Sequence, residues 1–125
     1  MQRIILDTNF LLAVFELRVD IFAEIERVCD FRYQLFILDR TLDEVENLIK
    51  SSLLSKRQAA KGALQLIKLK NIQIIHTNDS GMVDDILVDL DGYIVATIDM
   101  ELKRRLRKKG TQIITIRQKK YVMLE

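Results

Sequence analysis

The sequence predicts an α/β fold in which helices cover both faces of a central parallel sheet. Two observations lead to this prediction. Short apolar runs rich in Ile and Val alternate with longer amphipathic segments, which is typical of strand–helix units. The chain also has no proline, no linker-like segment and no internal repeat, and 125 residues suit one domain, residues 1–125, around a single core. With 49% hydrophobic and 30% charged residues, the composition excludes a disordered chain.

The first part of the chain is expected to form two strands and two helices. Residues 4–6 are a short apolar run that predicts a buried strand. After Asp20, apolar side chains recur at the spacing of one helix face. Residues 34–38 predict the second strand. Thr41 and Glu44 have the spacing of a capping box, which predicts that the next helix opens at Thr41 and holds Glu44 in its first turn.

The middle of the chain continues the alternation. Residues 55–70 predict a second consecutive helix, with small and apolar side chains facing inward. Residues 71–76 predict the third strand, residues 77–81 a polar turn, and residues 82–90 a helix. The apolar, β-branched run 93–97 is expected to be the central strand.

The last part of the chain is basic. A helix is expected from residue 100 until Gly110, because glycine commonly ends a helix. Residues 112–116 predict the last strand, and the tail 117–125 is expected to dock only in part.

Composition excludes several classes of protein. No apolar stretch approaches the roughly 20 residues that a membrane span requires, and no signal-peptide pattern opens the sequence, so we expect a cytoplasmic location and no membrane partner. Cys29 is the one cysteine, which excludes an internal disulfide and a cysteine-rich zinc site.

The net charge of +2 conceals an uneven distribution. Residues 1–99 carry 11 Lys and Arg against 16 Asp and Glu, whereas residues 100–125 carry 9 against 2. An acidic body can hold cations and a basic end can hold a polyanion, although a solvated basic helix and tail explain the same pattern.

Four elements are expected to bring carboxylates to one edge of the sheet. Ligands of parallel α/β sheets bind beyond the carboxyl ends of the strands, so acids that follow strands are the candidates. They are Asp7, Glu44, Asp84 with Asp85 as an adjacent alternative, and Asp99. Close carboxylates repel one another unless a cation neutralises them, and hard oxygen ligands suit Mg²⁺ or Mn²⁺. Because such a metal activates water and stabilises charge at phosphorus, the pattern predicts phosphodiester hydrolysis.

Each of these acids also has a purely structural explanation. Asp7 and Asp99 could cap the helices that follow them, and Glu44 could complete the capping box. Asp84 and Asp85 could favour the positive end of a helix dipole. His76 is the only histidine, so no Ser-His-Asp or Cys-His arrangement competes.

The helix after Asp99 supplies a candidate surface for RNA. Leu102 and Leu106 are spaced to anchor one side of it. Lys and Arg contacts to phosphates give affinity without reading the sequence of bases. The expected RNA-binding residues are Lys103, Arg104, Arg105, Arg107 and Lys108, followed by Lys109.

Four segments together resemble the PIN-domain ribonucleases. They are "IILDTN" at 4–9, "LDEVENL" at 42–48, "VDDILV" at 83–88 and "YIVATIDMELKRRLRKKG" at 93–110. The resemblance covers essentially the whole chain, and the last segment is the most specific. It implies a three-layer α/β/α sandwich and endonucleolytic, Mg²⁺- or Mn²⁺-dependent cleavage of RNA.

The resemblance also implies roles for individual residues. The family's acids fall on Asp7, Glu44, Asp84 and Asp99, of which Asp7, Asp84 and Asp99 would bind the metal and Glu44 would bind it through water or orient the attacking water. Thr8, Asn9, Asp85 and Thr97 are the expected supporting residues. Two positions depart from the family pattern: Asp91 replaces a small residue, and Ile98 replaces a common Asn.

The cellular role stays open between two kinds of PIN protein. Small members are commonly VapC toxins with a cognate antitoxin. The segment after residue 94 is most similar to that of archaeal PIN proteins related to nucleases that process precursor ribosomal RNA. The resemblance also implies a homodimer. Two other classes of protein are alternatives: a non-catalytic RNA- or protein-binding module, and a phosphoacceptor receiver domain. The receiver domain is disfavoured because it expects paired acids after the first strand, where Asp7 stands alone, and a Lys after the last, where Arg117 stands.

Overall fold

Strands and helices alternate in the computed structural model, which describes residues 1–78 and 81–125. The strands are β1 (Gln2–Leu6), β2 (Tyr33–Leu38), β3 (Gln73–Ile75), β4 (Ile94–Ala96), β5 (Ile113–Arg117) and β6 (Tyr121–Leu124). The helices are α1 (Thr8–Glu16), α2 (Ile21–Val28), α3 (Asp39–Leu48), α4 (Leu54–Leu69), α5 (Val83–Asp89) and α6 (Met100–Lys109).

The strands form one mixed sheet in the order β3-β2-β1-β4-β5-β6. The first five strands are parallel, and β6 pairs with β5 in antiparallel orientation. After β1 the chain forms β2 on one side of β1, and it later forms β4 on the opposite side of β1. This reversal is a topological switch point, the place where open α/β sheets bind their ligands.

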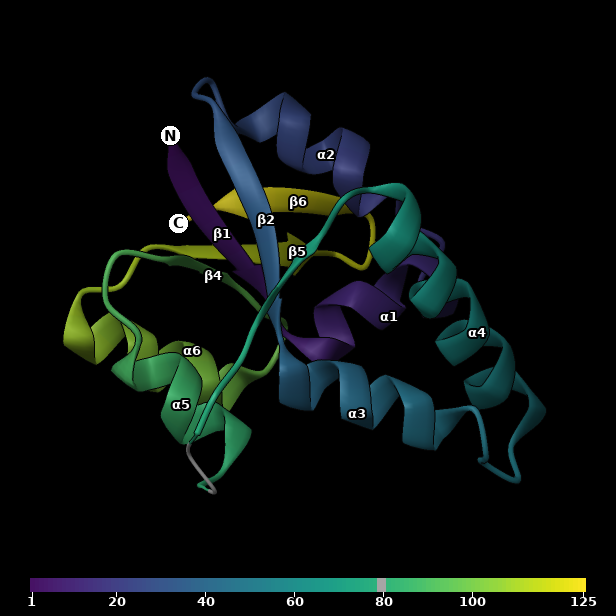
Figure 1. Cartoon of the computed structure of the whole chain (residues 1–125). Coiled ribbons are helices and arrows are strands. Elements are labelled where there is room, and N and C mark those ends of the chain that lie inside the picture. Colours follow the sequence, from purple (N-terminus) through teal and green to yellow (C-terminus); the bar gives the residue numbers. More distant parts are fainter. Residues whose placement is uncertain (79–80) are drawn as a thin grey trace.

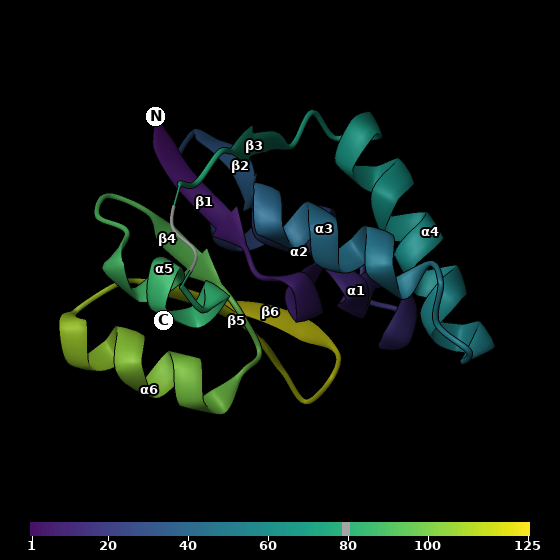
Figure 2. The same cartoon turned by 60° about the horizontal axis from the view of Figure 1, so that its bottom comes forward.

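The helices lie on both faces of the sheet (Figure 1; Figure 2). Helices α1, α2, α3 and α4 contribute to the core on one face, where Phe10 and Leu11 of α1 are fully buried. Helices α5 and α6 pack on the other face through Leu87 and Leu102, which meet Val95 of β4. The predicted three-layer α/β/α sandwich is confirmed, and its sheet, which was predicted to be parallel, is mostly parallel because β6 is antiparallel.

The central strands explain why the sheet is covered on both sides. Ile4, Ile5 and Leu6 of β1 are fully buried, and Ile5 faces α5 and α6 while its two neighbours face the opposite core. Strands buried on both faces read as continuous apolar runs. The predicted central position of the 93–97 run is confirmed, because β4 lies next to β1 in the middle of the sheet.

The start of α3 differs from the prediction. The helix begins at Asp39, two residues before the expected capping box, and Leu38 at the N-cap makes no side-chain capping hydrogen bond. Thr41 is instead buried in the first turn, with 1% of its surface exposed. Glu44 therefore lies in the second turn. The prediction failed because residue spacing matched the capping motif while strand β2 runs directly into the helix.

The tail also differs from the prediction. Instead of docking only in part, it forms β6 and closes a hairpin with β5. Gln118 and Lys119 have φ angles of 55° and 57°, the left-handed backbone of the tight turn that joins twisted antiparallel strands. The usual Asn-Gly or Asp-Gly signal is missing from this turn, which hides the hairpin in the sequence.

Residues 79 and 80 of the predicted polar turn lie outside the described residues. Among the helices of the described part, none is long and apolar enough to span a bilayer.

Candidate active site

Asp7 is the buried centre of the candidate site. It follows β1 directly and caps α1, and its exposed surface is 7%. Its Oδ1 accepts a hydrogen bond of 2.9 Å from the Thr8 backbone N–H, and its Oδ2 accepts one of 2.8 Å from the Thr97 hydroxyl. The sequence offered two explanations of Asp7, helix cap and site residue, and the structure shows the cap. The same two hydrogen bonds also hold the carboxylate in one orientation at the switch point.

Thr97 connects Asp7 to Asp99. The Thr97 hydroxyl is fully buried and accepts a hydrogen bond of 3.1 Å from the Asp99 backbone N–H while it donates to Asp7. Asp99 caps α6 by accepting a hydrogen bond of 2.9 Å from the Leu102 backbone N–H. One threonine between two strands thus sets the relative position of two acids that are 92 residues apart in the sequence.

The environment of Asp7 disfavours its charged form. Burial raises the pKa of Asp7 from 3.8 to about 6, against the opposing hydrogen bonds from Thr97 and Thr8. The negative charges of Asp84 and Glu44 raise it further. These two electrostatic contributions show that acids from α5 and α3 lie close enough to Asp7 to repel it.

Asp84 and its neighbour Asp85 have different surroundings. Burial raises the pKa of Asp84, and the charge of Asp99 adds to this effect. Asp85 is exposed and forms an ion pair of 2.8 Å with Arg105. Asp84 is affected by the charges of both Asp99 and Arg105, whereas Asp85 is paired directly with Arg105. This difference favours Asp84 over Asp85 as the site residue.

The acids do not form a closed cage. Within the described residues, no group of three or more His, Cys, Asp or Glu side chains is arranged to enclose a metal ion. Mg²⁺ does not require such a cage, because it is usually held by one or two carboxylates together with waters and substrate phosphates. The carboxylates at the switch point are hard oxygen donors of the kind that Mg²⁺ binds, and a cation beside them would oppose the rise in the pKa values of Asp7 and Asp84.

The two supporting residues after Asp7 differ in their exposure. The Thr8 hydroxyl is buried and has no hydrogen-bond partner among the described residues. Buried polar groups nearly always have a hydrogen-bond partner, and a water or a substrate oxygen beside Asp7 would provide one for the Thr8 hydroxyl. Asn9 is exposed on the first turn of α1.

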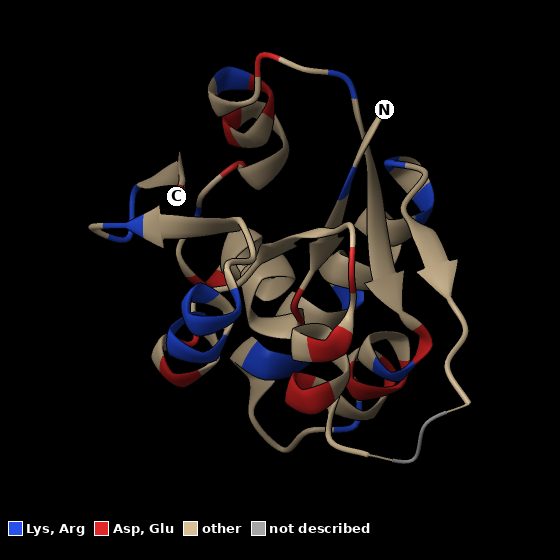
Figure 3. Ribbon diagram, turned by 90° about the vertical axis from the view of Figure 1, so that its left-hand side faces the viewer, with Lys and Arg blue, Asp and Glu red and all other residues tan. Residues whose placement is uncertain are grey.

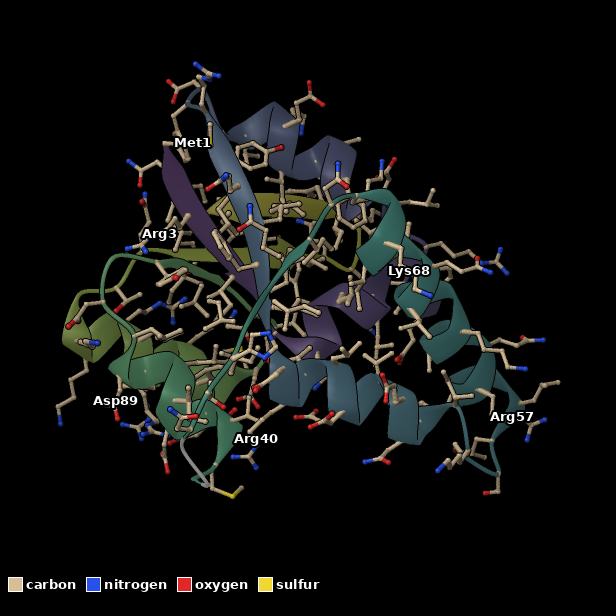
Figure 4. The ribbon with its side chains drawn as sticks, in the orientation of Figure 1. Met1, Arg3, Arg40, Arg57, Lys68 and Asp89 are labelled. Carbon is tan, nitrogen blue, oxygen red and sulfur yellow. The ribbon has the colours of Figure 1, made fainter. Side chains whose placement is uncertain are left out.

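Asp39 and Arg40, which the sequence analysis did not single out, hold the segment before α5. The Asp39 carboxylate accepts hydrogen bonds of 3.0 Å from both the backbone N–H and the hydroxyl of Thr77. The Arg40 guanidinium donates to the Gly81 carbonyl, and Figure 4 shows Arg40 between the start of α3 and α5. These contacts join the helix that carries Glu44 to the segment that leads to Asp84. The sequence feature that could have indicated these two residues is their position directly after β2, at the carboxyl end of a parallel strand.

The basic side chains of α6 are largely paired with acids. Acidic and basic segments lie interspersed at the end of the molecule toward which the parallel strands point (Figure 3). Ion pairs join Arg104 to Glu101, Arg105 to Asp85, Arg107 to Glu125 and Lys109 to Asp91. Lys108 is exposed, and no hydrogen bond or ion pair involves it among the described residues. The predicted basic surface is therefore less positive than its composition indicates.

Lys103 does not lie on that surface. Only 7% of it is exposed, and its ammonium group donates a hydrogen bond of 3.2 Å to the buried Thr115 hydroxyl. The prediction that Lys103 belongs to the exposed basic face is wrong, because i, i+4 spacing places it on the same side of α6 as Asp99, toward the sheet.

Comparisons with known proteins agree with this geometry. Residues 4–119 match the family of PIN-like domains. The chain belongs to this family. The PIN-like chain is 33% identical to ribonuclease VapC4 of Methanocaldococcus jannaschii, over 97% of its own length and 95% of that protein. It is 27% identical to ribonuclease VapC9 of Archaeoglobus fulgidus, over 97% and 87% of the two chains.

Solved structures show the same PIN-like architecture. The PIN domain endonuclease Utp24 superposes with a TM-score of 0.79 at 25% identity, covering 98% of this chain and 90% of that one. A domain of a functionally unknown protein from Methanocaldococcus jannaschii superposes with a TM-score of 0.62 at 13% identity, over 94% and 92% of the two chains, and supports the fold alone.

Proposed function

We propose that this PIN-like domain is a divalent-metal-dependent endoribonuclease with its active site at Asp7, Glu44, Asp84 and Asp99. The observation that carries the proposal is the buried Asp7 carboxylate, whose pKa is raised by burial and by the charges of Asp84 and Glu44 at the switch point of the sheet. The names of the VapC and Utp24 relatives, which are ribonucleases and an endonuclease, support the same chemistry.

Each side chain has a role that follows from its surroundings. Asp7, fixed by Thr97 and Thr8, and Asp99, fixed as the cap of α6, would be the principal metal ligands, with Asp84 sharing the ion. When bound, Mg²⁺ or Mn²⁺ would activate a water and offset the charge that develops on the phosphate. Glu44 is exposed on the second turn of α3, and its proposed role is to bind the metal through a water or to orient the attacking water.

RNA is the proposed substrate, and its phosphates would contact α6. Lys108, Arg104 and Arg105 are the basic side chains that we propose as phosphate contacts. For Arg104 and Arg105 this requires exchange of a carboxylate partner for a phosphate. Because both of these ion pairs are exposed, their exchange costs little free energy.

A cleavage assay with a matched control tests the proposal. Asp7→Asn is expected to abolish Mg²⁺- or Mn²⁺-stimulated cleavage of a structured RNA, and EDTA is expected to abolish cleavage by the unchanged protein. Asp89→Asn removes an exposed acid from α5, the helix that also carries Asp84, and is expected to cleave normally. Undiminished cleavage by Asp7→Asn contradicts the assignment, and metal-independent RNA binding without cleavage would instead indicate a non-catalytic module.

The cellular setting that we propose is a toxin–antitoxin pair, because the 33% identity to ribonuclease VapC4 extends over nearly the whole chain. Expression of the protein is then expected to arrest growth, and Asp7→Asn to relieve the arrest. The likeness to the endonuclease Utp24 favours a second candidate, the processing of precursor ribosomal RNA. Accumulation of uncut precursor when the protein is depleted, without growth arrest on expression, would select that role.

A further inference from the structure

Lys103 is a buried charge that the proposed reaction does not use. It lies on α6 between the core residues Leu102 and Leu106, and 7% of its surface is exposed. None of the ion pairs among the described residues includes Lys103. Lysine is almost never buried without a compensating negative charge. The neutral Thr115 hydroxyl, which accepts its hydrogen bond, does not provide one.

The sheet register places Lys103 at the end of a polar row. Leu6, Ala96 and Ile114 are aligned across the neighbouring strands β1, β4 and β5. The next residue along each strand is Asp7, Thr97 and Thr115 respectively, so these three side chains follow one another across the sheet edge on the α6 side. Thr97 donates to Asp7 at one end of the row, and Lys103 donates to Thr115 at the other. With strands about 4.8 Å apart, Thr115 and Asp7 lie roughly 10 Å from one another across the sheet, and the ammonium is bonded to Thr115.

The helix brings Lys103 toward a second acid. Asp99 and Lys103 are spaced i, i+4, and the Lys103 backbone N–H donates to the Asp99 carbonyl at 2.9 Å. Side chains with this spacing lie on the same face of a helix. Asp99 and Lys103 therefore lie on the same face of α6, near the carboxyl ends of β4 and β5.

We propose that Lys103 is a positioning residue of the acidic cluster, the internal counter-charge that compensates its carboxylates and limits how tightly they bind a divalent cation. This inference rests on the proposed metal-dependent function. A fixed positive charge in the interior lets the fold keep several acids together before the cation arrives. It also repels the cation once it is bound, and a buried charge is screened much less by salt than an exposed one.

Three substitutions of Lys103 separate its charge from its packing. Lys103→Met keeps the volume and loses the charge, Lys103→Gln loses the charge but keeps a hydrogen-bond donor for Thr115, and Lys103→Arg keeps the charge. Lys108→Met removes an exposed positive charge from the same helix and serves as the control. The measurements are the Mn²⁺ dissociation constant by calorimetry at fixed pH and ionic strength, and the Tm in EDTA and in Mn²⁺.

Both neutral variants are expected to bind Mn²⁺ at least about fourfold more tightly than the unchanged protein, which is the effect of one charge on a divalent ion roughly 10 Å away at the dielectric constant of water, and the effect is larger at the lower effective dielectric constant of a protein. Their Tm is expected to rise more on addition of Mn²⁺. Lys103→Arg and Lys108→Met are expected to stay within about twofold. A neutral variant that folds only with Mn²⁺ present would also support the inference.

Two results would overturn it. Equal Mn²⁺ affinity in the neutral variants and the unchanged protein would show that Lys103 does not act on the cluster. Neutral variants that fail to fold in both EDTA and Mn²⁺ would show that Lys103 is a core residue only. The affinity of the unchanged protein reports separately on the proposed function: if it binds no Mn²⁺, both proposals fail, whereas unaltered ratios with measurable binding reject the role of Lys103 alone.

Discussion

Replacing Asp7 by Asn is expected to stabilise the metal-free protein at neutral pH while it abolishes cleavage. Asp7 is 7% exposed, and its pKa in the folded protein is about 6, against an ordinary value of 3.8. Each pKa unit corresponds to about 1.4 kcal/mol, so the ionised carboxylate costs the fold about 3 kcal/mol at pH 7. Asn has a single oxygen, so it keeps an acceptor for the Thr97 hydroxyl but turns its NH₂ group toward the Thr8 backbone N–H, which loses its acceptor at a cost of about 2 kcal/mol. The expected net gain is about 1 kcal/mol.

The pH dependence of this gain has a definite sign. Between about pH 4 and pH 6 the folded state binds more protons at Asp7 than the unfolded state, so the Asp7 contribution to stability falls as the pH rises. Below about pH 4 both states are protonated and the cost disappears; above about pH 6 it is complete. Asp39 and Glu24 have lowered pKa values, caused by hydrogen bonds from Thr77 and Arg27, and give the opposite slope. The informative quantity is therefore the difference between the two proteins.

Urea denaturation in EDTA at pH 4 and pH 7.5 measures that difference. Asp7→Asn is expected to gain about 1 kcal/mol over the unchanged protein at pH 7.5 and to lose about 2 kcal/mol at pH 4, where only the loss of the hydrogen bond from the Thr8 N–H remains. Asp89→Asn, an exposed acid, is expected to show no change at either pH. The reasoning is refuted if Asp7→Asn shifts stability equally at both pH values, or destabilises the protein at pH 7.5.

The remaining predictions concern the hydroxyls, a helix end and the basic helix. Thr97→Val removes a buried hydroxyl with two hydrogen-bond partners and is expected to lower the free energy of unfolding in urea by about 1–3 kcal/mol. The Thr8 hydroxyl has no partner among the described residues, so Thr8→Val is expected to leave the free energy of unfolding in EDTA nearly unchanged. Equal losses of stability in the two variants would contradict the hydrogen-bond network around Thr97. Gly110→Ala is expected to lower the free energy of unfolding by about 1 kcal/mol, because Gly110 has a φ of 86°. An added Cβ would meet no atom within 4 Å, so this loss comes from the backbone conformation alone. Replacing both Lys108 and Arg104 by Ala is expected to raise KM for RNA and flatten its salt dependence with kcat unchanged, and an unaltered salt slope would show that α6 does not contact phosphates.

Most of the architecture could be predicted from local sequence patterns. The runs at 4–6, 34–38, 93–97 and 112–116 are apolar and β-branched because their strands are buried on both faces, which produces a signal that does not depend on distant contacts. Most helices were predicted from one apolar face that must meet the sheet. Helix α1 was not among the predicted elements, because most of its buried residues are consecutive and give no one-sided spacing. The other two errors, at Thr41 and in the tail, arose where a local motif was misleading or absent: a capping spacing inside a continuing helix, and a hairpin turn formed without glycine.

The sequence by itself determined which acids are candidates, because a carboxylate that directly follows an apolar run must lie at the end of a strand. It also determined the family, through segments spread over the chain and matched across residues 4–119. Only the tertiary structure decided how these residues act on one another. Asp7 is buried by residues from distant parts of the chain. Its hydrogen bond with Thr97 and the ion pair of Asp85 with Arg105 each join residues at least 20 positions apart. The inward direction of Lys103 depends on the rotation of α6 against the sheet. The sequence shows a charge at this position, but packing decides whether that charge faces water or the interior.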